Sequence, residues 1–284
     1  MTAPIYRSEE GRKLLLSYYS SLLAKWAVPA EEKILPTSFG PGFALCSGSM
    51  HAPALILLHG SSSNSAMWME EAAILSKHFR VCCIDLPGEC GKSSMNRLAW
   101  TGGQHSIWLA EVLDGLGIQK TFLAGCSTGG WISLDFALSY PERTSGVALL
   151  APAGLVQVRL STLIRVLSLS LTGRYGIRRI EKMVYGSFDG PPEVNEFAGL
   201  VREHFIPRNE ALPLFSDEQL GKLSTPLCYF GGAQDCFYDS DRAGKRLGKL
   251  LPAAEVNILE GRGHILTGLA EELQDFFLRY SHDS

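Results

Sequence analysis

The 284-residue sequence is short of charge, since Asp, Glu, Lys and Arg make up 19% of it, below the usual share of about 25%. Its net charge is −3, and no strongly basic cluster interrupts it. Nucleic acids and anionic membranes attract proteins through clustered Lys and Arg, so we expect neither as a partner. The length suits one large domain, with or without an insertion. Nothing in the composition predicts an oligomeric state.

The sequence also lacks the marks of export. Residues 1–13 contain no apolar core of a signal peptide, and the longest apolar runs are far shorter than a membrane span of about 20 residues. The seven cysteines are odd in number and form no C-x-x-C pair. Several of them lie in apolar runs, so we interpret the cysteines as buried reduced thiols of a cytoplasmic protein.

From residue 54 onward, short apolar runs alternate with segments of helical length. The runs are nearly continuous in hydrophobicity, which is typical of strands buried on both faces. This alternation predicts an α/β fold, a mostly parallel sheet flanked by helices. We predict strands at Ala54–Leu58, Val81–Ile84, Thr121–Ala124, Val147–Leu150, Leu227–Phe230 and Val256–Leu259. We predict helices at Met67–Lys77, Thr101–Leu116, Gly130–Ser139, Ser240–Leu250 and Thr267–Tyr280.

Two further elements precede this alternation. Residues 8–26 carry apolar side chains at near-helical spacing, which predicts an amphipathic helix on the outside of the fold. Two short runs at 33–39 and 42–47 are split by Gly40-Pro41, and this pattern predicts a β-hairpin.

A long insertion separates two of the predicted strands. About seventy residues lie between Leu150 and Leu227 without a strand-like run, too many for a structureless loop in a compact domain. We therefore predict a helical cap at 153–223, inserted between core segments 1–152 and 224–284. Its apolar residues are expected to pack within the cap, with an apolar substrate pocket as the alternative. These residues are Leu163, Leu167, Leu171, Tyr175, Met183, Tyr185 and Phe188.

The sharpest motif is a G-x-S-x-G pattern at residues 125–129. The pattern alone is a weak signal, but here a predicted strand precedes it and a predicted helix follows. A strand, a tight turn with Ser and a helix form a nucleophile elbow, in which a strained Ser backbone projects its hydroxyl above the sheet edge. We therefore predict that Ser127 is a nucleophile. The alternative is a turn of small residues that only packs a helix on a strand.

A serine hydroxyl needs a base to remove its proton, and His264 is the best placed of the seven histidines. It follows the last predicted strand, and functional groups gather at the carboxyl ends of parallel strands. Asp235 follows the preceding strand in the same way, and a carboxylate beside the imidazole would fix its tautomer and stabilise the imidazolium. Asp239 and Asp241 are alternatives for this acid, but they lie where the next predicted helix begins.

A third strand end predicts an oxyanion hole. The strand that ends at Leu58 leads through His59-Gly60 into a polar loop. Gly60 would let the backbone turn so that the N–H of Ser61 faces the nucleophile, and the N–H of Thr128 would be the second donor. Loss of one such donor typically costs about 3 kcal/mol of transition-state stabilisation. We interpret His59 as a structural residue that braces this loop, and we expect His105, near a helix start, to be exposed to solvent.

Taken in order, these motifs resemble those of the α/β-hydrolases. The resemblance rests on His59-Gly60, Asp85-Leu86-Pro87-Gly88-Glu89-Cys90-Gly91-Lys92-Ser93, Gly125–Gly129, Gly232–Asp235 and Gly263-His264. The second element is similar to the family's D-x-P-G-x-G-x-S loop, which shapes the pocket wall, with one more residue between the glycines. The order Ser, Asp, His along the chain is also that of this family.

Within the family, the chain is similar to bacterial carboxylesterases of the naproxen-esterase type. The N-terminal helix, the hairpin at Phe39-Gly40 and the loop that ends in Met67-Trp68 carry this likeness. One departure lies after the histidine, where Ile265-Leu266-Thr267-Gly268 replaces the acidic-Pro pair of many relatives. This departure concerns helix packing more than mechanism.

The resemblance implies a serine carboxylesterase that cleaves small-molecule esters through an acyl-enzyme, without a metal or organic cofactor. Ser at position 127 disfavours the dehalogenase and epoxide-hydrolase branches, which use Asp there. C–C bond hydrolysis, amide hydrolysis and acyl transfer on the same triad are alternatives. A ligand receptor or signalling protein that keeps the triad but turns over slowly is an alternative from another class.

Overall fold

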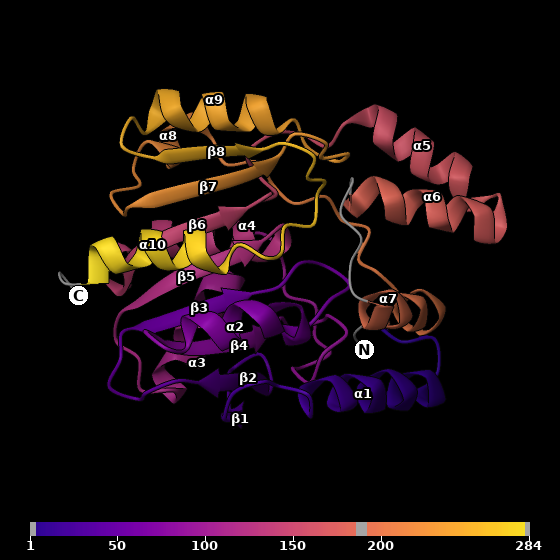
Figure 1. Ribbon diagram of the computed structural model, residues 1–284, viewed down its shortest axis with the longest axis horizontal. Coiled ribbons are helices and arrows are strands. Elements are labelled where there is room, and N and C mark those ends of the chain that lie inside the picture. The colour runs from indigo at the N-terminus through magenta and orange to yellow at the C-terminus, as the bar shows by residue number, and fades with distance from the viewer. Residues whose placement is uncertain (1–3, 186–191, 282–284) are drawn as a thin grey trace.

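The fold is built on a single eight-stranded sheet (Figure 1). A computed structural model of the protein describes residues 4–185 and 192–281. The strand order is β1-β2-β4-β3-β5-β6-β7-β8; β2 is antiparallel to both neighbours, and β4 to β8 with β3 run parallel. The strands are β1 (Ala30–Leu35), β2 (Gly42–Ser47), β3 (Ala54–Leu58), β4 (Arg80–Asp85), β5 (Thr121–Cys126), β6 (Thr144–Leu150), β7 (Leu227–Gly232) and β8 (Glu255–Leu259).

Helices cover both faces of this sheet. Side chains of α3, α4 and α9 share one apolar cluster with one face, and side chains of α2 and α10 share a second cluster with the other face. No helix in the described ranges is long and apolar enough to cross a membrane. The helices are α1 (Glu9–Leu23), α2 (Met69–Leu75), α3 (Gln104–Gly115), α4 (Thr128–Ser139), α5 (Leu160–Ser170), α6 (Gly173–Tyr185), α7 (Pro192–His204), α8 (Asp217–Leu220), α9 (Ser240–Leu250) and α10 (Ala270–Tyr280), with short 3-10 helices η1 (Ser65–Trp68) and η2 (Pro141–Arg143).

The predicted α/β fold is confirmed, and its strands lie where the apolar runs predicted them. The expectation that every predicted strand is buried on both faces is wrong for β8. Val256 in this strand is 38% exposed, because β8 is at the edge of the sheet. The last helix begins at Ala270 instead of Thr267. Gly268 has a φ of +70° and its N–H donates to Glu71, so the backbone is not helical at this point.

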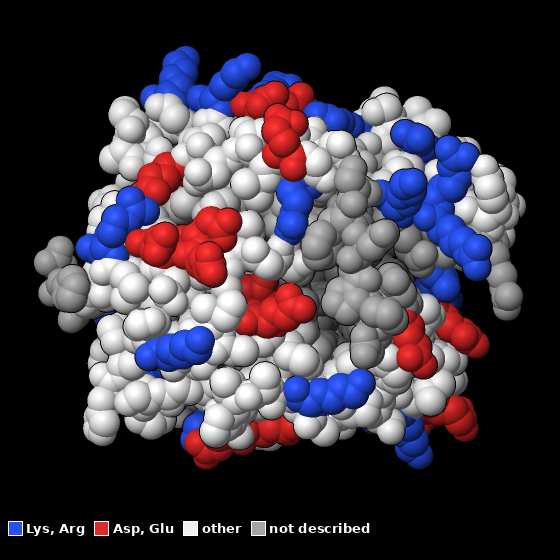
Figure 2. All heavy atoms as spheres, in the orientation of Figure 1, with Lys and Arg blue, Asp and Glu red and all other residues white. Residues whose placement is uncertain are grey.

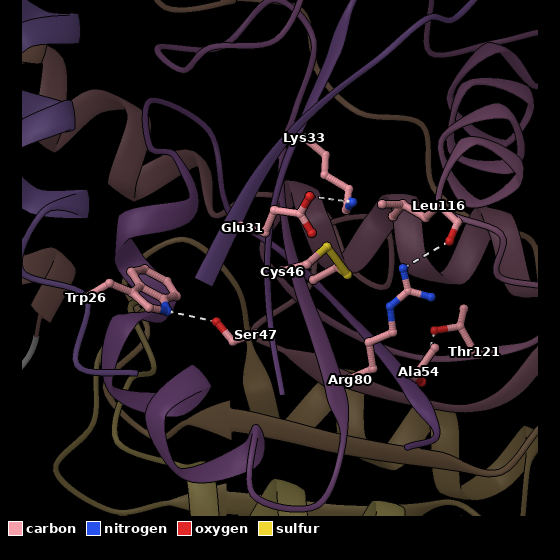
Figure 3. The surroundings of a disulfide bond; sticks show 10 residues. Trp26, Glu31, Lys33, Cys46, Ser47, Ala54, Arg80, Leu116 and Thr121 are labelled. Atoms are coloured by element: carbon pink, nitrogen blue, oxygen red, sulfur yellow. Dashed lines mark hydrogen bonds and ion pairs between the residues drawn. A yellow bond between two sulfur atoms is a disulfide. The ribbon is translucent and has the colours of Figure 1, made fainter. Parts of the chain in front are cut away.

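The interpretation of all seven cysteines as reduced thiols is wrong for two of them. Cys46 in β2 and Cys82 in β4 are joined by a disulfide (Figure 3). The antiparallel register of these strands places the two residues directly opposite each other, with their Cα atoms 4.2 Å apart. Their separation of 36 residues in sequence hides this pairing, because only the sheet brings them together. The other five cysteines are free.

The segment between β6 and β7 contains α5 to α8. Helices α5 and α6 extend away from the sheet, whereas α7 lies beside α1 (Figure 1). The ring of Tyr18 in α1 stacks on Phe197 of α7, and its hydroxyl donates to Glu196. Residues 153–156 and 215–223 include buried side chains of the sheet's own cluster. The division into a core and a cap at 153–223 stays a prediction.

A buried carboxylate at the end of β4 ties three segments together. Asp85 is fully buried. Its Oδ1 accepts hydrogen bonds from the Tyr19 hydroxyl at 2.9 Å and from the N–H and hydroxyl of Ser65 at 2.8 and 2.7 Å, and its Oδ2 accepts from the Lys92 N–H at 2.7 Å. Helix α1, the start of η1 and the loop after β4 are therefore fixed to the sheet by one side chain.

Replacement of this carboxylate tests the network. In Asp85→Asn one carboxylate oxygen becomes an amide nitrogen, which faces a donor and leaves a buried group unpaired. We expect the free energy of unfolding in urea to fall by about 2 to 4 kcal/mol. Tyr19→Phe, the matched control, removes a single hydrogen bond and should cost about 1 kcal/mol. Equal losses in the two variants would contradict the network.

Candidate active site

Ser127 lies at the tight turn from β5 into α4. Its backbone has φ 50° and ψ −109°, a conformation that L residues rarely adopt and that costs about 1 to 3 kcal/mol. The surrounding backbone holds it there: the Ser127 N–H donates to the carbonyl of Leu150 at 2.9 Å, and its carbonyl accepts from the N–H of Ala153 at 3.1 Å. The strained conformation is therefore maintained by the end of β6.

Two glycines make this turn possible. A Cβ on Gly125 would lie 2.3 Å from the carbonyl oxygen of Gly129, and a Cβ on Gly129 would lie 2.2 Å from the carbonyl oxygen of Leu58. Both distances are far shorter than any van der Waals contact, so α4 can approach β5 and β3 only without side chains at these positions. The turn therefore has the form of a nucleophile elbow.

The structure brings Ser127, His264 and Asp235 together in a line. The Oγ of Ser127 is 3.0 Å from Nε2 of His264, and Nδ1 of His264 is 2.9 Å from Oδ2 of Asp235. These residues follow β5, β8 and β7, so all three lie at the carboxyl edge of the parallel strands. Asp235 is 1% exposed. Its other oxygen accepts from the N–H groups of Phe237 and Tyr238 at 2.7 and 3.1 Å.

The alternative acids lie elsewhere. Asp239 caps α9 by accepting from the N–H of Arg242 at 3.0 Å, and Asp241 lies in the first turn of that helix. The aromatic rings beside His264 were not predicted: Phe237 lies 4.9 Å and Tyr238 5.4 Å from the imidazole, centroid to centroid. Their position two and three residues after Asp235 is the signal that the sequence offered.

The two residues predicted to form the oxyanion hole are also neighbours. The hydroxyls of Ser61 and Thr128 are 2.7 Å apart, and an ideal Cβ on Gly60 would lie 3.5 Å from Cβ of Ser127. Thr128 is the first residue of α4, where backbone N–H groups have no acceptor within the helix. The partial positive charge of a helix N-terminus is therefore directed at the space beside Ser127.

His59 is fully buried beneath this loop. Its Nε2 accepts from the N–H of Leu86 at 2.8 Å, which leaves Nδ1 to donate to the carbonyl of Gly60 at 2.7 Å. Burial lowers the pKa of His59, so the ring stays neutral in this role. The expectation for His105 is wrong, because this ring is 3% exposed and stacks on Trp100 at 4.4 Å.

Within the described residues, none of the other histidines forms a hydrogen bond with Ser127. His51 and His78 are exposed, and His204 is half-buried at the end of α7. His282, like Phe188 of the predicted cap, lies outside the described residues.

The inserted segment contacts the loops that carry Asp235 and His264. The carbonyl of Val184, in α6, accepts from the N–H groups of His264 and Ile265 at 2.7 and 3.2 Å. The N–H of Arg159 donates to the carbonyl of Phe237 at 2.8 Å. A cavity of about 450 Å³ lies at this junction, and its lining includes Asp235 but neither Ser127 nor His264. The space over Ser127 is therefore not this cavity.

The sequence analysis gave no role to Glu89, a buried acidic residue in the loop after β4. It is 7% exposed, and its Oε2 accepts from the N–H of Ser62 at 2.7 Å. The next residue, Cys90, donates from its thiol to the carbonyl of Ser63, and its own carbonyl accepts from the side chain of Asn64. Glu89-Cys90 is the longer stretch between the glycines of the loop after β4, and this irregularity was the available signal. Glu89 and Cys90 therefore hold residues 62–64, the part of the loop that follows Ser61, through hydrogen bonds.

Burial raises the pKa of Glu89 to about 7, although the Ser62 N–H and the positive charges of Arg97 and Arg208 act to lower it. Because the pKa of this carboxyl is raised in the folded state, the folded protein is most stable at low pH, where Glu89 is protonated. The neutral acid is tolerated below about pH 4.5, and ionisation of the buried group lowers the free energy of unfolding as the pH rises through 7.

Glu89→Gln removes this ionisation and keeps an oxygen for the Ser62 N–H. We expect equal stability of variant and wild type near pH 4.5, and a variant that is more stable by roughly 3 kcal/mol at pH 8. Urea unfolding at both pH values measures the difference. Glu142→Gln, at an exposed position, controls for the loss of one negative charge. A Glu89→Gln difference that does not change with pH would contradict the effect.

Comparison with known proteins agrees with this geometry. Residues 53–164 match the family model described as the alpha/beta hydrolase fold. The chain is 29% identical to carboxylesterase YbfK of Bacillus subtilis, over 91% of this chain and 90% of that protein. The crystal structure of that enzyme superposes with a TM-score of 0.83 and covers 97% of this chain, at 27% identity and 99% of that chain.

A second carboxylesterase of Bacillus subtilis is similar to the same extent. The crystal structure of naproxen esterase superposes with a TM-score of 0.84 at 26% identity, and the match covers 96% of this chain and 99% of that one. The predicted resemblance is therefore confirmed. The chain has the alpha/beta hydrolase fold and is similar to the bacterial carboxylesterases of the naproxen-esterase type.

Proposed function

We propose that the protein is a serine carboxylesterase in which Ser127 is the nucleophile, His264 the general base and Asp235 the acid that orients the base. The observation that carries the proposal is the continuous line from Ser127 Oγ to His264 to Asp235, with contacts of 3.0 and 2.9 Å. Carboxylesterases that match most of the chain support ester hydrolysis.

In the first half-reaction, Ser127 Oγ attacks the ester carbonyl while Nε2 of His264 takes its proton. Asp235 accepts a hydrogen bond from Nδ1–H of His264, so Nε2 carries the free lone pair and the imidazolium that forms is stabilised. The N–H groups of Phe237 and Tyr238 hold the other oxygen of Asp235. The carboxylate therefore cannot rotate away from the imidazole.

The tetrahedral intermediate carries a negative oxygen, and the N–H groups of Ser61 and Thr128 would bind it. Their position next to Ser127 and at the N-terminus of α4 supports this role. His264 then donates its proton to the leaving alcohol. In the second half-reaction a water molecule, deprotonated by His264, attacks the acyl-enzyme and releases the carboxylic acid with Ser127 restored.

The substrate is proposed to be a small-molecule ester, and α5 to α7 are proposed to form the cap at 153–223 over the site. The hydrogen bonds from the His264 loop to Val184 support a cap that borders the base. No metal or organic cofactor is needed for this chemistry. C–C bond or amide hydrolysis, acyl transfer and a receptor role would require a different substrate for the same residues.

We also propose a cytoplasmic location. Five of the seven cysteines are free, as is usual in a reducing compartment. The disulfide joins Cys46, which is 7% exposed, to Cys82, which is fully buried. Small thiols reduce disulfides by direct attack on sulfur, and burial limits this access.

Hydrolysis of a p-nitrophenyl ester series from acetate to longer chains tests the proposal. We expect wild-type turnover on the order of 1 s⁻¹ or faster for the best ester, and a loss of about 10⁴-fold or more in Ser127→Ala because no nucleophile remains. Ser49→Ala, at an exposed serine, is the control. Negligible turnover by a folded wild type would contradict the esterase assignment, and labelling of Ser127 by a fluorophosphonate would then point to another substrate class.

Substitution of the acid tests the assignment of roles within the site. Asp235→Asn keeps the shape but presents an amide to His264, which favours the wrong tautomer, so kcat should fall about 10⁴-fold. Asp239→Asn is the matched control, because Asn caps a helix about as well as Asp and activity should stay within about twofold. A large loss in Asp239→Asn with little change in Asp235→Asn would reverse the assignment.

A further inference from the structure

The hairpin of α5 and α6 exposes an unusual amount of apolar surface. Exposed large hydrophobic side chains are concentrated between residues 158 and 175. Four of them follow one another at steps of 4, 3 and 4 positions, three on α5 and the fourth at the residue that caps its C-terminus, which places them on one side of the helix. They are Leu160 (70% exposed), Ile164 (61%), Leu167 (67%) and Leu171 (83%). We call these four the apolar ridge.

The apolar ridge is not the side of α5 that packs on the protein. Thr162 is 5% exposed and its hydroxyl donates to the carbonyl of Cys236, so it marks the inner side of the helix. Val166 and Leu169, on the same side as Thr162, are half-buried. The expectation that apolar cap residues pack inside the cap is therefore wrong for Leu167, Leu171 and Tyr175. A helix that is packed on one side and apolar on the other is suited to a second contact.

Helix α6 adds positive charge to the same hairpin. Arg178, Arg179 and Lys182 are exposed and recur at helical spacing, so they share one side of α6, which we call the basic ridge. Val184, on the opposite side of α6, is half-buried. Lys182 and the half-buried Met183 also line the cavity at the junction with the core. In Figure 2 the Lys and Arg side chains gather over α5 and α6, whereas acidic side chains lie over α7 and α1.

The distribution of charge along the chain is strongly uneven. Between residues 159 and 185 there are six Lys and Arg residues and one acidic residue, a net charge of +5, whereas the whole chain carries −3. The remainder therefore carries −8. The expectation of no anionic partner rested on the net charge and on the absence of a basic cluster, and this segment contradicts the second of these, because it produces a local positive field at one end of the molecule.

We propose that the α5–α6 hairpin docks on the surface of an anionic phospholipid bilayer, with the apolar ridge inserted among the acyl chains and the basic ridge next to the headgroups. Exposed Leu and Ile beside exposed Arg and Lys are the composition of helices that lie in a membrane interface. A bilayer offers both an apolar layer and negative charge, so it complements both ridges.

A second copy of the chain fits this surface less well. A symmetric dimer through the hairpin would bring the same patch of both subunits together. Two segments with a net charge of +5 each would then face one another, and like charges across an interface oppose association. The docking would place the proposed cap at the lipid surface, and it does not depend on the assignment of Ser127 as nucleophile.

Co-sedimentation with vesicles tests the proposal. We expect the wild type to pellet with phosphatidylcholine vesicles that contain about one third phosphatidylglycerol, and to stay in solution with pure phosphatidylcholine, since each basic residue near an anionic surface contributes about fivefold in affinity. Leu167→Gln with Leu171→Gln should weaken binding on the order of a hundredfold, because two side chains no longer insert. Arg178→Gln with Arg179→Gln should weaken it about 20-fold or more.

Two matched controls separate the hairpin from general surface effects. Ile34→Gln with Met50→Gln changes side chains that are 62% and 59% exposed away from the cap, and Lys245→Gln with Lys249→Gln changes exposed cations of α9. Both pairs should bind vesicles like the wild type. Circular dichroism spectra that match the wild type would show that all variants are folded.

Three outcomes would overturn the proposal. The wild type could stay in solution with anionic vesicles at low salt, or the Leu167→Gln and Leu171→Gln variant could bind as the wild type does. In the third, the wild type dimerises in solution, the same variant is monomeric and vesicles are not bound. That result would assign the apolar ridge to a second copy of the chain.

Discussion

The backbone conformation of Ser127 is the constraint on which the rest of the site depends. A residue at φ 50° projects its hydroxyl above the sheet only while the neighbouring chain segments hold it in place. Gly125 and Gly129 remove the side chains that would separate α4 from β5 and β3, and the end of β6 supplies the hydrogen bonds that maintain the turn. The position of α4 follows from this turn, and with it the position of the helix N-terminus beside Ser127. His264 and Asp235 need only loops of the right length after β8 and β7, because the parallel sheet already brings those strand ends to the same edge.

Around this turn, buried polar side chains fix loops that would otherwise be mobile. His59 connects the loop after β3 to the loop after β4, and Asp85 connects the latter to α1 and η1. Glu89 adds a hydrogen bond to Ser62. These contacts restrict the loop that carries Ser61 and Ser62. The loop after β4 is therefore more than a wall of the pocket, because it positions the proposed oxyanion donor.

The inserted segment has two different relations to the core. Helix α7 packs on α1 through aromatic contacts and is part of the body of the molecule. Helices α5 and α6 contact the core through hydrogen bonds to the loops of Asp235 and His264 and otherwise extend outward. Contact between this hairpin and another surface would therefore act directly next to the proposed base. The separation of positive charge on the hairpin from negative charge on the remainder gives the molecule a defined orientation in any external field.

The sequence by itself determined the α/β fold, the strand positions and the three residues that the structure aligns, because apolar periodicity and strand-end motifs are local signals. It did not reveal the disulfide between Cys46 and Cys82, since residues far apart in sequence are paired only by the register of β2 and β4. Glu89, Phe237 and the burial of His105 were missed for the same reason: burial and contact depend on what packs against a residue. The outward direction of Leu167 and Leu171 was likewise decided by the tertiary structure. Helical spacing shows that two residues share a side of a helix, but only packing decides which side faces the protein.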